Sequence, residues 1–399
     1  MNKSVNNLGW CIINIKGRGT KLNVQQLKED IIQYSKTIGI DKIGFTTASP
    51  FGELKNRLLR QQELGYQSGF EEPNIDKRIN PSLLMEEPRS IISIALAYPS
   101  KMKNRVVSKK GERRGLFCRA SWGTDYHIIL RDRLEKLEQY ILMKVPEARV
   151  KSMVDTGALS DRAVAERAGI GWSGKNCAII TPEFGSYVYL GEMITNLPFE
   201  PDQPIEDRCG TCNKCIDACP TGALVQGGQI NARRCISFLT QTKGFIAEEF
   251  REKIGNRIYG CDSCQTACPE NRGKDFHFHD EMETNPEEIK PLLKRMLSLS
   301  NREFKNDFGH LAGSWRGKNP IQRNAIIALG HFKDESSLDD LISIMEKDTR
   351  PVMRGTSAWA IGKIGGQMAN QALEKAREKE EDTDVLEEIE KALIKCQNE

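Results

Sequence analysis

Eight cysteines in the middle of the chain have the spacing of ligands to iron–sulfur clusters. They are Cys209, Cys212, Cys215, Cys219, Cys235, Cys261, Cys264 and Cys268. The first four, followed by Pro220, form a C-x2-C-x2-C-x3-C-P run, which is the spacing that binds 4Fe–4S clusters. A second run, from Cys261 to Pro269, repeats the last three cysteines of that pattern but lacks the first. Cys235 lies between the runs and is the natural replacement, so the segment has enough ligands for two clusters.

The fourth cysteine of such a run ligates the other cluster, so the two runs are expected to exchange their last ligands. The expected ligands of the first cluster are Cys209, Cys212, Cys215 and Cys268. The expected ligands of the second cluster are Cys219, Cys235, Cys261 and Cys264. Because each run contributes to both clusters, the two clusters must lie close together, and this suits the transfer of electrons one at a time.

Zinc and disulfides are the competing uses for so many cysteines. Structural zinc usually takes two pairs of ligands and stops at four, and disulfide frameworks belong to secreted proteins. The apolar stretch from Trp10 to Ile15 is too short and too polar for a signal peptide. Twelve cysteines, eight of them used as thiolates, therefore predict a reducing compartment, and the cytoplasm is the expected location.

The composition is that of a folded protein with two or three domains. Of the 399 residues, 39% are hydrophobic and 28% are charged, as in globular proteins. The net charge is only +3, so a nucleic-acid surface would have to be a local patch. No run of about 18 apolar residues occurs, so no membrane span is expected.

The elements that position the cysteines begin with an expected α+β sheet domain over residues 22–200. Apolar patterning predicts strands at 42–45, 90–98, 150–155, 178–180 and 186–194. Helices are expected at 22–32, 51–64, 125–140 and 160–168, and the third of them should bury a stripe that includes Ile128 and Leu134. Residues 1–21 precede the regular pattern and are interpreted as a leader or an extension.

Two loops of this domain have unusual compositions. Residues 101–114 carry seven basic residues and one acid, Glu112, so they form either a mobile connection or an arm that contacts phosphates. The glycine-rich segment 169–176 has neither the spacing of a P-loop nor the preceding strand of a dinucleotide-binding fingerprint. NAD is therefore unsupported, whereas flavin and corrinoid stay open. A corrinoid would lack the usual histidine ligand, because no Asp-x-His-x-x-Gly run occurs.

The cysteine segment is expected to form a ferredoxin-like domain over residues 201–285, with a helix at 245–255 between the two runs. The tail, 286–399, repeats itself, because residues 319–330 recur as 350–362 with their prolines 31 residues apart. A further helix at 385–394 completes the pattern. Helical pairs at this period predict an all-α, HEAT-like repeat domain, which typically binds a partner.

Three stretches make the chain resemble the epoxyqueuosine reductase family, the iron–sulfur and cobalamin enzymes that finish queuosine synthesis in tRNA. They are residues 123–127, residues 154–157 together with 167–176, and the eight-cysteine segment. With the repeats, the resemblance covers about residues 22–399. It implies that the N-terminal domain binds cobalamin, and that an epoxide on the wobble nucleoside is reduced to an alkene with electrons supplied by the clusters. It also implies a monomer that takes electrons from an external one-electron donor.

The resemblance gives roles to further residues. Asp155 is expected to be the acid that protonates the epoxide oxygen, with a pKa raised by burial beside the corrin. The candidate contacts to cobalamin are Arg78, Cys118, Asp155, Ser173, Asn176, Ser186 and Gln241. The candidate contacts to tRNA phosphates are Lys243, Arg316, Lys318, Arg323 and Arg354. The acidic residues 378–382 are expected to face away from RNA, and Cys11, Cys177 and Cys396 are expected to be plain thiols.

Two other functions compete with this interpretation. A reductive dehalogenase-like enzyme would share cobalamin and two clusters, but it would usually carry a twin-arginine leader and would have no use for the repeats. A non-catalytic electron-transfer protein with a docking tail would need no cofactor other than the clusters.

Overall fold

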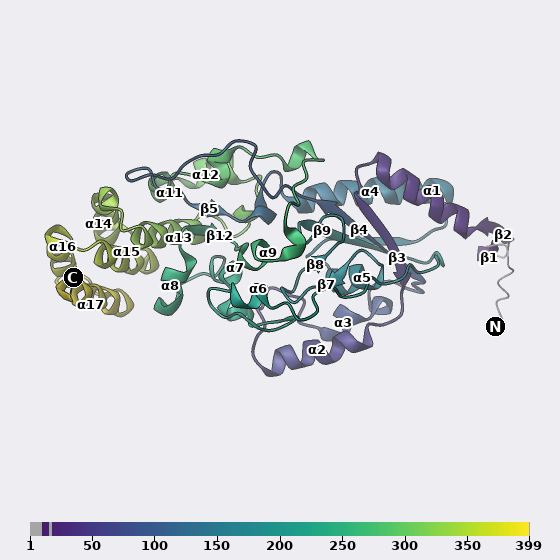
Figure 1. Ribbon diagram of the computed structural model, residues 1–399, viewed down its shortest axis with the longest axis horizontal. Coiled ribbons are helices and arrows are strands. Elements are labelled where there is room, and N and C mark those ends of the chain that lie inside the picture. Colours follow the sequence, from purple (N-terminus) through teal and green to yellow (C-terminus); the bar gives the residue numbers. More distant parts are fainter. Residues whose placement is uncertain (1–9, 16–17, 399) are drawn as a thin grey trace.

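The computed structural model describes residues 10–15 and 18–398. The molecule is elongated, with a sheet and its helices near the N-terminal end, the helical repeats at the C-terminal end, and the cysteine segment between them (Figure 1). Within the described part of the chain, no helix is long and apolar enough to cross a membrane.

The N-terminal half is built on a four-stranded antiparallel sheet in the order β3-β4-β9-β6. Its strands are β3 (Lys42–Thr47), β4 (Ser90–Ala97), β6 (Val150–Met153) and β9 (Val188–Thr195). The strand expected at 178–180 exists as β8 (Ile179–Ile180), but it lies outside this sheet. Among the described residues it pairs with β7 (Trp172–Ser173) alone, as a short separate ladder.

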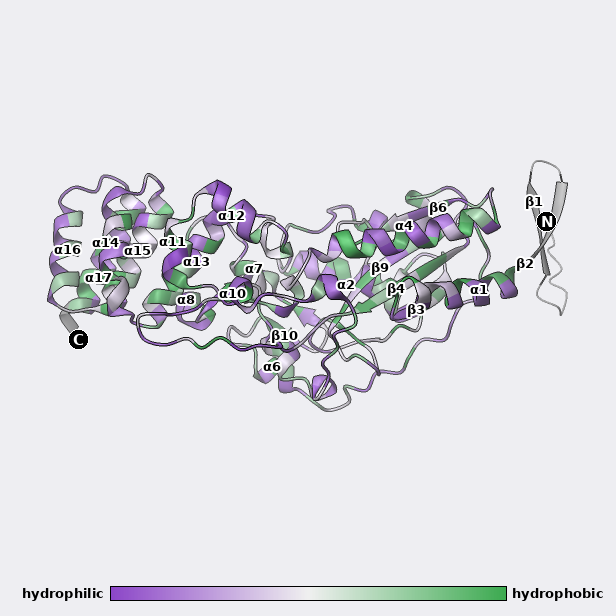
Figure 2. Cartoon of the chain, turned by 90° about the horizontal axis from the view of Figure 1, so that it is seen from above, coloured by the Kyte–Doolittle hydropathy of each residue, from purple (hydrophilic) through white to green (hydrophobic). Residues whose placement is uncertain are grey.

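Helices cover both faces of this sheet (Figure 1). They are α1 (Val24–Thr37), α2 (Gly52–Glu63), α3 (Ile75–Ile79), α4 (Tyr126–Lys144) and α5 (Asp161–Arg167). Ile92 and Ile94 of β4 pack in the core shared with α1 and α4, while Ile91 and Ala95 point to the opposite face. Burial on both faces explains why β4 is continuously apolar, as its green colour in Figure 2 shows. The expectation that Ile128 is buried is wrong, because its side chain faces solvent and is 59% exposed.

The first described residues form an antiparallel hairpin of β1 (Trp10–Ile15) and β2 (Arg18–Asn23). Regular structure therefore begins earlier than the sequence pattern indicated, while the rest of the expected leader, 1–9 and 16–17, lies outside the described residues. Asn23 ends the hairpin and caps α1, because its side chain accepts a hydrogen bond from the Gln26 backbone N–H at 3.0 Å.

The basic loop at 101–114 runs along the second half of the chain. Lys110 pairs with Glu335 at 3.1 Å, and Arg114 pairs with Glu287 at 2.7 Å. After the loop, β5 (Leu116–Phe117) pairs in parallel with β12 (Arg257–Tyr259) of the cysteine segment. The loop therefore joins the two halves of the molecule rather than projecting from one of them.

The two cysteine runs have matching local structure. Each forms a single helical turn, α6 (Lys214–Asp217) in the first run and α9 (Ser263–Thr266) in the second. Between them lie β10 (Leu224–Gln226), β11 (Gln229–Ile230), α7 (Ile236–Leu239) and α8 (Glu248–Ile254). The expected helix at 245–255 is confirmed as α8.

The tail is entirely helical, as its repeats predict. Its helices are α10 (Pro286–Ile289), α11 (Leu293–Ser298), α12 (Asn301–Phe308), α13 (Lys318–His331), α14 (Leu338–Lys347), α15 (Pro351–Ile364), α16 (Gln367–Arg377) and α17 (Thr383–Asn398). Gly330 and Gly362 end the two repeated motifs where the next helix lies too close for a side chain. A Cβ would meet Trp359 at 2.7 Å in one case and Ala392 at 2.7 Å in the other. The cysteine segment shares its apolar core with these helices, since α7 and α8 contribute Ile236, Phe250 and Ile254 to it.

Candidate functional site

The four cysteines expected to bind the first cluster line one cavity. The lining residues are Lys175, Asn176, Ile180, Arg208, Cys209, Cys212, Cys215, Cys268, Pro269 and Glu270. The Cys212 backbone N–H donates to the Cys209 carbonyl at 3.0 Å, and this tight turn directs both side chains to the same space. Cys215 follows on α6, and Cys268 arrives from the second run, as the exchange of last ligands predicts.

The other four cysteines form a second group. Burial raises the pKa of the Cys264 thiol, and the neighbouring Cys261, Cys235, Cys219 and Cys215 raise it further. Burial also raises the pKa of Cys235 to about 11. The Ala223 backbone N–H donates to Cys219 Sγ at 3.2 Å. Iron binding would keep these thiols deprotonated, because metal ligation requires the thiolate.

All eight cysteines are free thiols, which contradicts a disulfide framework. Over residues 10–15 and 18–398, no three His, Cys, Asp or Glu side chains gather closely enough to hold one metal ion. A four-iron cluster has a different requirement, because each thiolate binds its own iron at a corner of a cube. The two groups of cysteines therefore fit two clusters by surrounding a space rather than by converging on a point.

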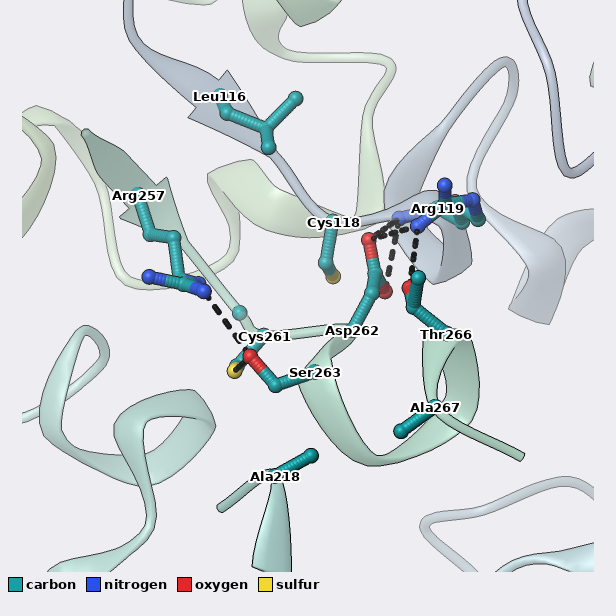
Figure 3. Close-up of a pocket in the computed structure, with 11 residues that line it drawn as sticks. Leu116, Cys118, Arg119, Ala218, Arg257, Cys261, Asp262, Ser263, Thr266 and Ala267 are labelled. Carbon is teal, nitrogen blue, oxygen red and sulfur yellow. Dashed lines mark hydrogen bonds and ion pairs between the residues drawn. The ribbon is translucent and has the colours of Figure 1, made fainter. Parts of the chain in front are cut away.

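A cavity of about 510 Å³ lies beside the second group (Figure 3). It is lined by Leu116, Cys118, Arg119, Ala218, Arg257, Gly260, Cys261, Asp262, Ser263, Thr266 and Ala267. Arg119 pairs with the Asp262 carboxylate at 2.9 Å across one wall. Cys118 is buried on the same wall, and burial raises the pKa of its thiol. Cys118, a predicted cobalamin contact, therefore lies next to Cys261 of the second group.

Asp155 lies two residues beyond the end of β6, where the chain turns sharply with a φ of 45°. Its carboxylate accepts a hydrogen bond from the Tyr126 hydroxyl at 2.8 Å. His127 Nε2 lies 3.4 Å from the same oxygen, and the Asp155 backbone N–H donates to Asp161 Oδ2 at 3.0 Å. The Asp155 side chain is 58% exposed, so it remains accessible to a substrate.

His127, not Asp155, holds the proton in this arrangement. The Asp125 carboxylate, 2.8 Å from His127 Nδ1, and the Asp155 carboxylate raise the pKa of His127 to about 9. His127 in turn lowers the pKa of Asp155, against the opposing effect of burial. The expectation that burial raises the pKa of Asp155 is therefore wrong: near neutral pH the pair is a carboxylate beside an imidazolium.

Two buried acids next to Asp155 were missed by sequence reasoning. Burial, followed by the charge of Asp155, raises the pKa of Asp161 to about 6. Burial also raises the pKa of Glu192 well above its usual value, and neither of its carboxyl oxygens has a hydrogen-bond partner among the described residues. A signal existed for Glu192, since it is the one charged residue in an otherwise apolar strand. His127 also had a signal, because it lies in the Asp-x-His spacing of residues 125–127.

The remaining predicted cobalamin contacts do not gather in one place. Burial lowers the pKa of Arg78, which lies on α3 and has Glu71 and Asp161 among its charged neighbours. Ser173 lies on β7, where its backbone N–H donates to Glu166 at 3.1 Å. Asn176 lines the cavity of the first cluster instead.

Ser186 and Gln241, two of the predicted cobalamin contacts, make hydrogen bonds within the protein. The buried Ser186 hydroxyl accepts hydrogen bonds from Asn271 at 2.8 Å and from Gln265 at 3.1 Å, and these bonds fasten the sheet to the second cysteine run. Gln241 Oε1 accepts from Trp315 Nε1 at 2.9 Å and from the Tyr259 hydroxyl at 3.3 Å.

Two of the five predicted tRNA contacts are engaged within the protein. Arg323 is 1% exposed, and its guanidinium donates to the carbonyls of Leu239, Thr242 and Gly244 in the loop after α7. Arg354 is paired with Glu380 through two contacts of 2.7 Å. Glu380 belongs to the acidic stretch at 378–382. Part of that stretch therefore contacts Arg354, one of the predicted tRNA contacts, instead of facing away from it. Both arginines hold the repeats together.

The other three basic residues stay close to the surface. Lys243 is exposed, and Lys318 donates to the Leu299 carbonyl at 2.8 Å. The Arg316 guanidinium lies 4.4 Å from the centroid of the Trp315 ring and 4.7 Å from that of the Phe70 ring. Trp315 is 53% exposed and Phe70 is 43% exposed. We call Phe70, Lys243, Trp315 and Arg316 the aromatic–basic patch.

The fold and the site define a class: an iron–sulfur oxidoreductase that carries a helical-repeat domain. Family models match the chain as a 4Fe-4S double cluster binding domain at residues 208–271, as Epoxyqueuosine reductase QueG at 78–156, and as HEAT repeats at 317–394. An epoxyqueuosine reductase of Bacillus anthracis is 68% identical over 372 residues, which cover 93% of this chain and 98% of that one. The chain belongs to the epoxyqueuosine reductase family.

Solved structures agree with this assignment. A crystal structure of epoxyqueuosine reductase with a tRNA-Tyr epoxyqueuosine-modified stem loop has a TM-score of 0.92 at 66% identity, covering 94% of this chain and 100% of that one. A structure of the Bacillus subtilis enzyme, in which an aspartate catalytic loop is swung out of the active site, has a TM-score of 0.91 at 65% identity with the same coverage. Membership confirms the predicted fold class and the oxidoreductase assignment, and it replaces the dehalogenase-like and non-catalytic alternatives.

Proposed function

We propose that this protein reduces epoxyqueuosine to queuosine at the wobble position of tRNA, the last step of queuosine biosynthesis. The observation that carries the proposal is the arrangement of two cysteine groups beside a cavity, in a chain 68% identical to an epoxyqueuosine reductase. The reaction takes two electrons and two protons, breaks both carbon–oxygen bonds of the epoxide, leaves an alkene and releases water.

The test is conversion of the nucleoside. Oxygen-free protein is mixed with a one-electron donor and epoxyqueuosine-containing tRNA, and the nucleosides are separated after digestion. Queuosine is the expected product. Unchanged epoxyqueuosine, with cofactors loaded and donor present, would overturn the proposal.

Cobalamin is the second cofactor that we propose. Buried polar atoms without partners suit the amides of such a group, and among the described residues the two carboxyl oxygens of Glu192 are such atoms. Cys118 lies in the cavity next to Cys261, and Arg78 lies on α3 with Asp161 among its charged neighbours. These side chains would hold cobalamin, which when bound supplies a cobalt centre that collects single electrons from the clusters.

The chain itself manages the protons. At neutral pH the imidazolium of His127 keeps a proton on Nε2, which lies 3.4 Å from Asp155 Oδ2, and the Tyr126 hydroxyl orients the same oxygen. We propose that Asp155 accepts this proton from His127 and passes it to the epoxide oxygen, and that solvent supplies the second proton that releases the oxygen as water. The exposure of Asp155 allows the wobble nucleoside to reach it, while Asp125 prevents His127 from losing its orientation.

Substituting one ligand should remove one cluster. We expect Cys235→Ser to reduce the iron content of oxygen-free protein from about eight to about four atoms per chain, because Cys235 belongs to the second group only. Cys396→Ser is the matched control, since this thiol lies on α17 and should change nothing. Iron analysis and electron paramagnetic resonance report the outcome, and an unchanged iron content in Cys235→Ser would contradict the ligand assignment.

The aromatic–basic patch is the tRNA surface that we propose. Exposed aromatic rings stack on unpaired bases, and basic side chains attract phosphates. We expect Trp315→Ala to weaken binding of an anticodon stem loop about tenfold, as loss of one stacked base would, and Lys243→Ala to reduce the salt slope by about one. Fluorescence anisotropy measures the affinity and its salt dependence.

Phe278→Ala is the control, because it removes an exposed aromatic ring outside the aromatic–basic patch and should bind the stem loop normally. Equal losses of affinity in Trp315→Ala and Phe278→Ala would contradict the assignment.

The cofactors also bear on the location of the protein and on its electron donor. Thiolate ligands on half-exposed loops require a reducing surrounding, so we propose the cytoplasm as the location. An external one-electron donor must supply the first cluster, and we propose that the protein acts as a monomer.

A further inference from the structure

We propose that residues 172–176 form a hydrogen-bond cradle over the first iron–sulfur cluster and raise its reduction potential. This role, which rests on the two-cluster function proposed above, would explain the glycine-rich segment that fits neither a P-loop nor a dinucleotide fingerprint. The cradle consists of the side-chain amide of Asn176, the indole of Trp172 and the backbone N–H of Lys175.

Asn176 carries the strongest evidence. The residue is 6% exposed and lines the cavity that also contains Cys209 and Cys215. Its Oδ1 accepts a hydrogen bond from the Ala178 backbone N–H at 3.1 Å, so the orientation of the amide is determined. Its Nδ2 is then left buried without a partner among the described residues. Buried donors are normally satisfied, and a cluster sulfur in this cavity would supply the acceptor.

Trp172 supplies a second donor to the same place. It is 1% exposed, and its Nε1 is also buried without a partner among residues that the structure describes. Lys175, three residues further along the chain, lines the cavity together with Cys209 and Arg208. The Arg208 guanidinium lies 5.5 Å from the centroid of the Trp172 ring and adds a positive charge at the rim.

Close packing explains the glycine in this segment. A Cβ on Gly174 would lie 2.4 Å from Ile180 Cδ1 and 2.7 Å from Asn176 Oδ1, so a side chain there would push Asn176 out of the cavity. Lys175 then ties the segment to the first cysteine run, because its Nζ donates to the Gly210 carbonyl at 2.6 Å. Residues 174–176 are therefore packed against Ile180 and are also joined to the first cysteine run by a hydrogen bond.

Hydrogen bonds to the sulfur atoms favour the reduced cluster, because reduction adds negative charge to the cluster. The positive charges of Lys175 and Arg208 at the cavity act in the same direction, and Glu270 is the one carboxylate among the lining residues that opposes them. The first cluster should therefore accept an electron from an outside donor more readily than it would in a cavity lined with apolar groups.

The experiment is a redox titration of oxygen-free holoprotein, followed by electron paramagnetic resonance. Asn176→Asp keeps the size of the side chain and the acceptor for Ala178 but removes the donor. Trp172→Phe keeps the ring and removes the indole N–H. In each variant we expect the reduction equilibrium of one cluster to shift about tenfold toward the oxidised form, which is about 59 mV for one electron. The other cluster and the cob(II)alamin signal should not change.

Trp359→Phe is the matched control, because Trp359 is also buried with an unpartnered indole nitrogen but lies on α15. Its potentials should equal those of the unsubstituted protein. Full iron content with unchanged potentials in both test variants would overturn the proposal. A changed cob(II)alamin signal with unchanged cluster potentials would overturn it too, and would make Asn176 a cobalamin contact.

Two further outcomes are distinguishable. If Asn176→Asp fails to load iron, the cluster potentials of Trp172→Phe alone test whether the cradle raises the reduction potential. If the potentials shift as expected but the unsubstituted protein does not convert epoxyqueuosine-containing tRNA, the cradle stands and the proposed reaction fails.

Discussion

Asp155→Ala should retain both clusters and cobalamin but lose conversion of epoxyqueuosine-containing tRNA by about 10²–10⁴-fold, the usual contribution of a positioned acid. In the proposed mechanism the carboxylate, which contacts His127, relays the proton to the substrate, so its removal leaves the proton without a path to the epoxide oxygen. Asp155→Asn is the sharper variant, because asparagine tolerates the φ of 45° and preserves the oxygen that Tyr126 contacts. It should be equally inactive.

The pH dependence of single turnover should identify the same pair. The folded-state pKa of His127 is raised to about 9, so the proton is present at neutral pH and is lost as the pH rises through about 9. The rate should therefore be level near neutral pH and fall above about 9, and His127→Gln should abolish this limb. Asp76→Ala is the control, because this aspartate lies on α3 and pairs with Lys55 on the surface.

Full turnover of epoxyqueuosine-containing tRNA by Asp155→Ala would remove Asp155 from the mechanism.

Breaking the buried ion pair between α8 and α17 should have the largest effect on stability. Arg251 is 2% exposed, Glu388 is 9% exposed, and the two side chains are joined by two contacts of 2.6 Å. Arg251→Met leaves a carboxylate buried without its partner, and we expect it to lower the free energy of unfolding by about 3–5 kcal/mol. Because α8 follows the first cysteine run and α17 is the last helix, this pair connects the cluster segment to the repeats.

The double variant Arg251→Met/Glu388→Leu separates the two contributions to that cost. Replacing both charges with apolar side chains should recover most of the lost stability, because no uncompensated charge remains in the core. Arg60→Met is the matched control, since Arg60 and Glu63 form an exposed pair that is worth less than about 1 kcal/mol. Urea unfolding followed by circular dichroism measures all three. A cost for Arg251→Met no greater than that of the control would show that the pair does not stabilise the fold.

Patterns that are local in the chain were sufficient to predict many elements of the fold and the grouping of the cysteines. The spacing of the cysteines divided them into two groups, and the structure places Cys268 beside Cys209, Cys212 and Cys215 as that division expects. The continuous apolar run of β4 and the two repeat motifs around Gly330 and Gly362 likewise predicted their elements, because periodicity reflects which side of an element is buried.

Tertiary structure decided what each polar side chain does. Arg323 and Arg354 have the composition of phosphate contacts, yet packing turns one into the core and pairs the other with Glu380. Asp155 receives its protonation state from His127, which lies on another element. These outcomes depend on burial and on neighbours that are distant in sequence. A residue type and its spacing therefore determine which chemistry is available, and only the folded chain determines the charge and the partner with which that chemistry is performed.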